Sequence, residues 1–279
     1  MIDIEEKIRA LSKGDVAVLG VPLDENSSFL RGPALAPSRI REMLRSGSAN
    51  MSTELGVDLG SACGWTDLGD ISLSNGSEAF DQIESGISGI LERGARVLAL
   101  GGDHSISYPI VKAYSRTFQG LAILHLDAHP DTYDEYEGNR LSHACPFARI
   151  MEEGRVKRLI QIGIRTMNPH QRLQAERFGI TSVEMKDFSP DRLPELDGPV
   201  YLSLDMDVLD PAFAPGVSHH EPGGLTTRDV LKIIHGLPEE FVGADLVEFN
   251  PTRDTVSVTA MVAAKFYKEI VGRMLPQKP

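Results

Sequence analysis

Short apolar runs recur along the chain at strand-like lengths, and most are separated by segments with the period of a helix. The runs are rich in Val, Ile and Leu, as expected for strands buried on both faces. They span residues 15–21, 95–102, 121–127, 156–164, 199–205 and 241–247, with weaker candidates at 64–71 and 179–185. Helices are predicted at 77–94, 105–118, 168–179, 226–237 and 255–275. This alternation predicts an α/β fold whose parallel sheet is covered by helices on both faces.

Strands and helices alternate without a linker, a fixed repeat or a low-complexity segment, so we predict a single domain over residues 1–279. Three irregular stretches remain, at 22–37, 130–145 and 208–226, and they are rich in Gly, Pro, Ser and Asn. Long loops within a compact domain usually carry function.

The net charge of the chain is −12, from 40 acidic and 28 basic residues, which argues against nucleic acid or an anionic membrane as a partner. Residues 1–15 have a helical period without the features of a signal or transit peptide, and no run is long enough to span a membrane. We therefore expect a cytoplasmic enzyme. Cys63 and Cys145 are too few for a disulfide framework, so both are expected to be reduced in a packed interior.

Four of the apolar runs are followed directly by polar side chains that a buried strand would not carry by chance. These are His104; Asp127, His129 and Asp131; Asp205 and Asp207; and Glu248. Ligands in open α/β sheets bind beyond the carboxyl ends of the strands. In "ILHLDAHPDTYD" three potential metal ligands stand at alternate positions, which an extended chain directs to one side.

Each of these motifs has an ordinary structural explanation when taken alone. His104 could be a loop histidine, Asp205 and Asp207 a turn or a helix cap, and Glu248 a surface residue. Without Glu248, the six others supply four carboxylates and two imidazoles, and two divalent cations would neutralise the carboxylates. Ligands of this kind without thiolate favour manganese over zinc, although cobalt, nickel and zinc stay open. A water bridging two such ions loses a proton near neutral pH and becomes a nucleophile.

The segments "GGDHSIS", "DAHPD" and "SLDMDVLDPAFAPG" resemble the signature segments of the ureohydrolases, the family of arginases and agmatinases. Longer segments, among them "SHACPFARIMEEG", "APGVSHHEPGGLT" and "DLVEFNPTRDTVSVTAMVAAKF", resemble the plant-type arginases. The resemblance extends from about Val16 to Lys268. It implies a three-layer α/β/α sandwich around a mostly parallel sheet of about eight strands, and a homo-oligomer, either trimer or hexamer.

The same resemblance implies a role for each site residue. The ligands of a first manganese would be His104, Asp127, Asp131 and Asp205, and those of a second Asp127, His129, Asp205 and Asp207. His143 would be a proton shuttle, and Glu248 would hold the substrate guanidinium. Asp131 would pass the proton of the nucleophile to the departing amine.

The implied reaction converts L-arginine to L-ornithine and urea; the alternative is an agmatinase, which converts agmatine to putrescine and urea. The expected substrate-binding residues are Asn139, Ser142, His143, Asn168, His219 and Glu248. Recognition of the substrate tail departs from the animal and bacterial arginases, because the segment after "GIR" offers Asn168 and Gln171 in place of an acid. Acidic residues between Thr132 and Ser142 would favour a dicationic amine over a carboxylate.

Two other classes of protein share parts of this pattern. A deacetylase-like amide hydrolase uses a related sheet and a similar Asp-x-His motif, but usually with one zinc and a paired-histidine base. His219 and His220 are adjacent, yet their loop matches the ureohydrolases. A catalytically inactive metal-binding subunit would have no use for His143 and Glu248. Both alternatives are therefore less favoured.

Overall fold

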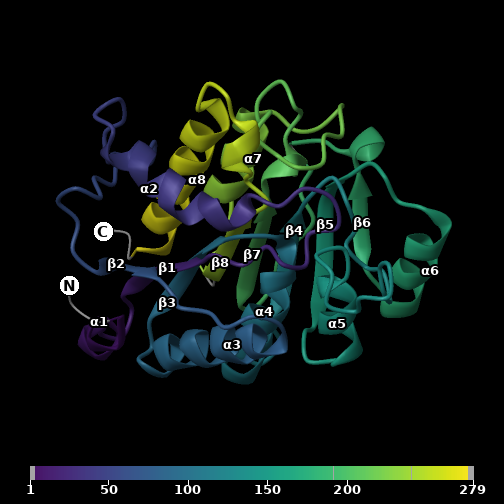
Figure 1. Ribbon diagram of the computed structural model, residues 1–279, viewed down its shortest axis with the longest axis horizontal. Helices are drawn as coiled ribbons and strands as arrows, with labels where there is room; N and C mark the ends of the chain where they lie inside the picture. Colours follow the sequence, from purple (N-terminus) through teal and green to yellow (C-terminus); the bar gives the residue numbers. More distant parts are fainter. Residues whose placement is uncertain (1–3, 191, 240, 276–279) are drawn as a thin grey trace.

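A single eight-stranded sheet runs through the centre of the computed structural model, which describes residues 4–190, 192–239 and 241–275 (Figure 1). The strands are β1 Val16–Val21, β2 Trp65–Asp70, β3 Arg96–Gly101, β4 Ala122–Leu126, β5 Arg158–Ile164, β6 Thr181–Glu184, β7 Val200–Asp205 and β8 Phe241–Val247. Their order across the sheet is β2-β1-β3-β8-β7-β4-β5-β6, and every neighbouring pair is parallel. Each of the eight apolar runs therefore forms a strand, as predicted.

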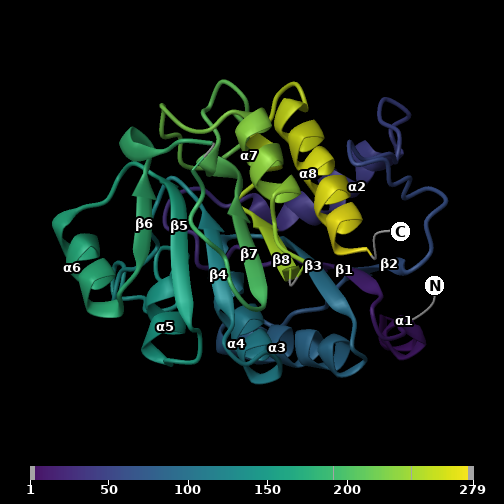
Figure 2. The ribbon, with the colours of Figure 1, turned by 180° about the vertical axis from the view of Figure 1, so that it is seen from behind.

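Helices cover both faces of this sheet and complete a three-layer α/β/α sandwich, which confirms the predicted fold (Figures 1 and 2). They are α1 Ile4–Ala10, α2 Ala36–Arg45, α3 Ser77–Glu92, α4 Ser107–Thr117, α5 Pro146–Glu152, α6 Pro169–Phe178, α7 Thr227–His235 and α8 Val258–Met274. α2, α7 and α8 form one layer, and α3, α4 and α5 form the other. α6 lies beside the edge strand β6.

The sheet separates two apolar cores, because successive side chains of a strand point to opposite faces. In β1, Val16 and Val18 pack into the core under α2, α7 and α8, whereas Ala17 and Leu19 pack into the core under α3 and α4. All of these side chains are almost fully buried. Burial on both faces explains why the strands read as continuous apolar runs rather than as alternating ones.

Some predicted boundaries and one predicted environment differ from the structure. The last helix begins at Val258 rather than at residue 255, because Ser257 before it has a left-handed backbone with φ 62°. Of the helical segment expected at 1–15, the structure shows α1, and residues 1–3 lie outside the described part. Cys145 is buried as expected, but Cys63 is exposed, so that prediction was wrong for Cys63. Among the described helices, none has the length and apolar character that a membrane span requires.

Candidate metal centre and active site

The predicted metal ligands and Glu248 lie at the ends of four strands that are neighbours in the sheet, in the order β3-β8-β7-β4. His104 follows β3, Glu248 follows β8, and Asp207 follows β7. Asp127, His129 and Asp131 follow β4. All four strands are parallel, so their carboxyl ends meet at one edge and bring these side chains together.

Short 3-10 turns hold the residues that follow two of these strands. After β3, the Asp103 carboxylate caps the turn His104–Ile106 by accepting a hydrogen bond from the Ser105 backbone N–H. After β7, the Asp205 carboxylate caps the turn Met206–Val208 by accepting from the Asp207 N–H at 2.7 Å. The capping role considered for the Asp-x-Asp motif is thus real for Asp205, and it coexists with a place in the ligand cluster.

His104 lies at the centre of one group of ligands. Its Nδ1 is 3.1 Å from carboxylate oxygens of Asp127, Asp131 and Asp205. The ring of His104 and the Asp127 carboxylate are completely buried, and Asp205 is 2% exposed. These four residues are the set expected for the first metal ion.

A second group lies next to the first and shares Asp127 with it. His129 Nδ1 is 3.0 Å from Asp207 Oδ2 and 3.4 Å from Asp127 Oδ1. One potential ligand atom from each of Asp127, His129 and Asp207 lies within 4.8 Å of the others. Burial and the neighbouring charges of Asp207 and Asp127 raise the pKa of Asp205 well above its ordinary value. So much negative charge in a buried place calls for a compensating cation.

The hydrogen bonds of His104 show that the cluster suits a metal ion. Ser203 Oγ donates to Asp245 Oδ1 at 2.7 Å, so it must accept from His104 Nε2 at 2.9 Å. Nε2 therefore carries a proton, and in the neutral ring that a metal ion requires, Nδ1 presents a lone pair. Nδ1 is buried and has no hydrogen-bond partner among the described residues. A lone pair that faces three carboxylates is repulsive unless a cation lies between them.

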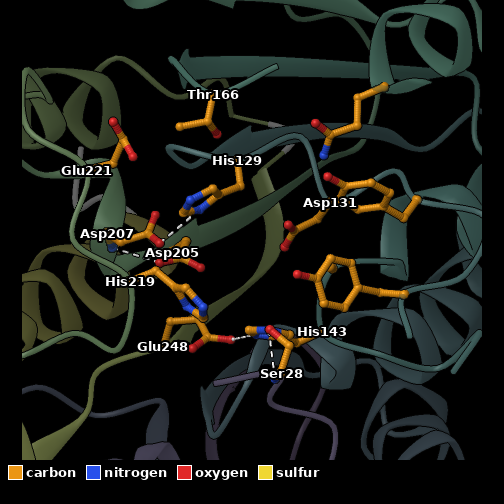
Figure 3. A pocket seen from close by; sticks show the side chains of 14 residues that line it. Ser28, His129, Asp131, His143, Thr166, Asp205, Asp207, His219, Glu221 and Glu248 are labelled. Atoms are coloured by element: carbon orange, nitrogen blue, oxygen red, sulfur yellow. Dashed lines mark hydrogen bonds and ion pairs between the residues drawn. The ribbon is translucent and has the colours of Figure 1, made fainter. Parts of the chain in front are cut away.

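Glu248 and His143 form a second functional pair beside the cluster. Glu248 Oε1 accepts from the His104 N–H at 2.8 Å and bonds His143 Nδ1 at 2.7 Å (Figure 3). On the other side of the ring, the Ser28 N–H and Oγ lie 3.1 and 2.8 Å from His143 Nε2. The Glu248 Oε2 atom makes no hydrogen bond or ion pair with a described residue and remains available.

The protonation of His143 depends on the charge around it. Burial disfavours the charged ring, but the Glu248 carboxylate outweighs this and raises the pKa of His143 to about 9. A backbone N–H at Nε2, however, requires that nitrogen to be unprotonated. Positive charge bound among the nearby carboxylates would lower the pKa and reconcile the two, so we take the ring as neutral with its proton on Nδ1.

Some side chains of each ligand group, together with His143 and Glu248, line one cavity of about 310 Å³ (Figure 3). Its lining consists of Ser28, His129, Asp131, Tyr133, Tyr136, His143, Ala144, Thr166, Gln171, Asp205, Asp207, His219, Glu221 and Glu248. This volume is at the small end of the range for ligand sites, which suits a compact metabolite. No lysine or arginine is among these lining residues.

Three of the residues expected to bind the substrate do not line this cavity. Asn139 donates to Asn26 Oδ1 and accepts from the Leu141 N–H. Ser142 Oγ accepts from the Ala144 N–H. Asn168 caps α6, and its Nδ2 donates to the Tyr133 hydroxyl at 2.5 Å. Their contact with substrate stays a prediction, whereas His219 does lie at the cavity wall.

Sequence reasoning missed several lining residues, although it singled out the loops that carry them. Ser28 comes from the stretch 22–37, Tyr133 and Tyr136 from 130–145, and Glu221 from 208–226. The composition of these loops indicated a functional role, but no local pattern showed which of their side chains would turn inward. A contact between distant segments places Ser28 at the site. Asn26, two residues before it, donates its N–H to Asp103 Oδ2 at 3.0 Å.

Comparison with known proteins agrees with this geometry. Residues 14–272 match the profile of the Arginase family, and the chain belongs to this family. "Arginase 1, mitochondrial" of Arabidopsis thaliana is 50% identical over 289 residues, which cover 96% of this chain and 84% of that protein. "Agmatinase" of Bacillus subtilis (strain 168) is 36% identical over 267 residues, covering 93% and 91%. The structure of an arginase from Medicago truncatula superimposes with a TM-score of 0.89 at 42% identity, covering 97% and 91%.

These relatives confirm the predicted family and its plant-type branch, and they correct one expectation. Arginases of Arabidopsis thaliana and Oryza sativa with 50% identity are named as mitochondrial, or as chloroplastic and mitochondrial, enzymes. The expectation of a cytoplasmic enzyme was therefore wrong. It rested on the ordinary composition of residues 1–15, which does not determine the compartment.

Proposed function

We propose that this protein hydrolyses the guanidinium group of L-arginine, giving L-ornithine and urea, with two manganese ions held by the six predicted ligands. One observation carries the proposal: a buried ligand cluster shares its cavity with a carboxylate whose second oxygen, Glu248 Oε2, is uncommitted. A purely structural metal site would not need such a group. The six predicted ligands would hold the two ions, and the cavity beside them would admit a water and a cationic substrate.

When bound, two divalent cations would lower the pKa of a water and so supply a hydroxide nucleophile near neutral pH. Glu248 Oε2 would accept N–H groups of the guanidinium and orient its carbon. The first proton of the attacking water would leave to solvent. Asp131, which lines the cavity beside His104, would carry the remaining proton of the hydroxide to the departing nitrogen. A C–O bond then forms, a C–N bond breaks, and the amine leaves neutral. His143 would exchange protons with solvent through Nε2, where Ser28 now contacts it.

The tail of the substrate distinguishes arginine from agmatine, because the guanidinium is common to both. The cavity offers the arginine carboxylate only neutral donors, such as the Tyr136 hydroxyl and Gln171 Nε2. Neither donor has a hydrogen-bond acceptor among the described residues in this structure. Hydrogen bonds from neutral groups can support selection of arginine, while the lack of a cationic residue keeps agmatine as the second candidate.

The test is urea release after manganese loading, measured with arginine, agmatine and a series of guanidino acids. We expect the highest kcat/KM for arginine, with some turnover of agmatine. A kcat/KM more than about tenfold higher for agmatine, equivalent to roughly 1.4 kcal/mol of transition-state preference, would contradict the arginase proposal and favour the agmatinase.

The proposal includes a homo-oligomer, a trimer or hexamer, as the family resemblance implied. Apolar side chains at the start of α8 support it, since Val256 and Val258 are 70% and 42% exposed. Light scattering at several protein concentrations measures the mass directly; a stable monomer at micromolar concentration would contradict this part of the proposal.

A further inference from the structure

We propose that Glu221 binds the ammonium group at the far end of the substrate; this inference rests on the proposed function. Of the five carboxylates that line the cavity, Asp131, Asp205 and Asp207 belong to the ligand cluster, and Glu248 bonds His143. Glu221 is the remaining one. Its carboxylate has no hydrogen bond or ion pair with any residue that the structure describes.

The nearest cation does not neutralise Glu221, because it is occupied elsewhere. The Arg165 guanidinium donates to backbone carbonyls, including Glu221 O from Nε at 2.9 Å and from Nη2 at 2.6 Å. It also donates to the carbonyls of Asp207 and Val208. Arg165 thus fixes the main chain at Glu221 while leaving the carboxylate without a partner. The backbone of Glu221 is held in place, but the charge of its carboxylate is not compensated by a described residue.

The loop around Glu221 is further tied on both sides. The Leu225 N–H donates to Val208 O, and the Asp210 N–H donates to Leu225 O, at 3.0 and 2.9 Å. Asp210 Oδ2 accepts from the Gly223 N–H at 2.7 Å. A loop backbone tied in this way loses little freedom when a ligand binds the Glu221 side chain.

Charge balance identifies the chemical class of the ligand. Two divalent cations would neutralise the four carboxylates of the cluster, which leaves Glu248 and Glu221 as the uncompensated charges of the cavity. Glu248 and Glu221 are separate positions on the cavity wall, and Asp205, Asp207 and His219 lie between them (Figure 3). Arginine and agmatine both carry two separated cations, a guanidinium and an ammonium. With the guanidinium at Glu248, Glu221 is the carboxylate that remains for the ammonium.

This placement also accounts for a departure in the sequence. The segment after "GIR" carries Asn168 and Gln171 in place of the acid of the animal and bacterial arginases, and Asn168 caps α6 and contacts Tyr133. Glu221 supplies the missing carboxylate from another loop.

The test compares substrates with and without the ammonium group in the wild type and in Glu221→Gln. The pairs are L-arginine with 5-guanidinopentanoate and agmatine with butylguanidine. We expect kcat/KM for the ammonium-bearing member to fall about tenfold or more, and that of its partner to change less than about threefold. Glu92→Gln removes the same charge at an exposed position in α3 and is the matched control. An equal change for both members of a pair overturns the proposal.

Binding of L-ornithine and of 5-aminopentanoate, measured by calorimetry on manganese-loaded protein, gives the same comparison without turnover. Glu221→Gln should weaken ornithine about tenfold and leave 5-aminopentanoate nearly unchanged. A wild type that releases no urea but shows this pattern contradicts the proposed reaction and supports the Glu221 site. Urea release from arginine without any discrimination at Glu221 overturns the site alone.

Discussion

Gln161 supports the ligand Asp127 from behind, and replacing it with leucine tests how much of the metal affinity depends on residues that never touch the metal. Gln161 Nε2 donates to Pro130 O at 2.7 Å and to His125 Nδ1 at 3.0 Å, and Oε1 accepts from Ser182 Oγ. A carbonyl can only accept, so the orientation of the amide is determined. The His125 proton is then on Nε2, which donates to Asp127 Oδ2 at 2.7 Å.

The magnitude follows from these contacts. Gln161 and His125 are completely buried, so Gln161→Leu leaves His125 Nδ1 and Pro130 O without partners. At about 1 to 3 kcal/mol for each unsatisfied group, the metal-free protein should lose roughly 2 to 6 kcal/mol of unfolding free energy. His125 would also be free to change tautomer and stop donating to Asp127. Losses of this kind typically reduce metal affinity by about 10 to 100-fold.

Two measurements separate the structural from the functional part. Unfolding by the denaturant urea, in the presence of a chelator that removes the metal, gives the stability of the metal-free protein. Competition with a chelator of known affinity gives the manganese affinity. Ser182→Ala is the matched control, because it removes only the hydrogen bond from Ser182 Oγ to Gln161 Oε1 and leaves those from Gln161 to His125 and from His125 to Asp127. It should change manganese affinity less than about threefold. Gln161→Glu keeps the size but cannot donate to His125, so it should weaken manganese as much as leucine does. Unchanged affinity in both Gln161 variants would refute the reasoning.

Three further outcomes are expected. Elemental analysis of the manganese-loaded protein should approach two metals per chain and should fall by about one in Asp207→Ala; one metal with full wild-type activity would contradict the two-ion site. His143→Ala should lower kcat by about a hundredfold or more and leave the metals bound, so loss of metal would identify it as a ligand. Arg228 lowers the pKa of the half-exposed Glu54 to about 2, below its unfolded value. The ionised Glu54 carboxylate therefore adds about 1 kcal/mol to the unfolding free energy, after allowance for solvent screening. This stabilisation is complete above about pH 5 and is lost toward pH 2. The difference in unfolding free energy between wild type and Glu54→Gln should shrink over that range.

The ligand cluster was predictable from sequence because its order is local. Asp127, His129 and Asp131 stand at alternate positions after an apolar run, and parallel strands bring such ends to one edge. His143 has no such local signature, and only the resemblance to a family assigned it a role. The role of His125 was not predicted either. It is a single polar residue within the apolar strand β4, and nothing in the sequence indicates that its ring donates to Asp127.

The wall of the cavity could not be predicted in the same way, because distant backbone contacts determine it. Glu221 faces inward since Arg165, which follows β5, binds its carbonyl, and Ser28 meets His143 since Asp103 binds its loop. Asn168 was expected at the substrate, but the helix that begins after it uses its side chain as a cap. An asparagine can either cap a helix or contact a substrate, and segments far away in the sequence determine which of the two it does.

Backbone strain at two site residues shows what the arrangement costs. Asp131 and Glu248 have left-handed backbones, with φ of 49° and 62°, which non-glycine residues rarely adopt and which cost about 1 to 3 kcal/mol each. The Glu248 N–H donates to Gly102 O at 3.0 Å, and a Cβ at Gly102 would lie 1.7 Å from Leu23 O. Only glycine permits this approach, so the loop after β1 and the end of β3 together hold Glu248 in place. The strained backbone of Glu248, the residue that we assign to guanidinium binding, lowers the free energy of unfolding. An unstrained backbone there would direct the carboxylate elsewhere.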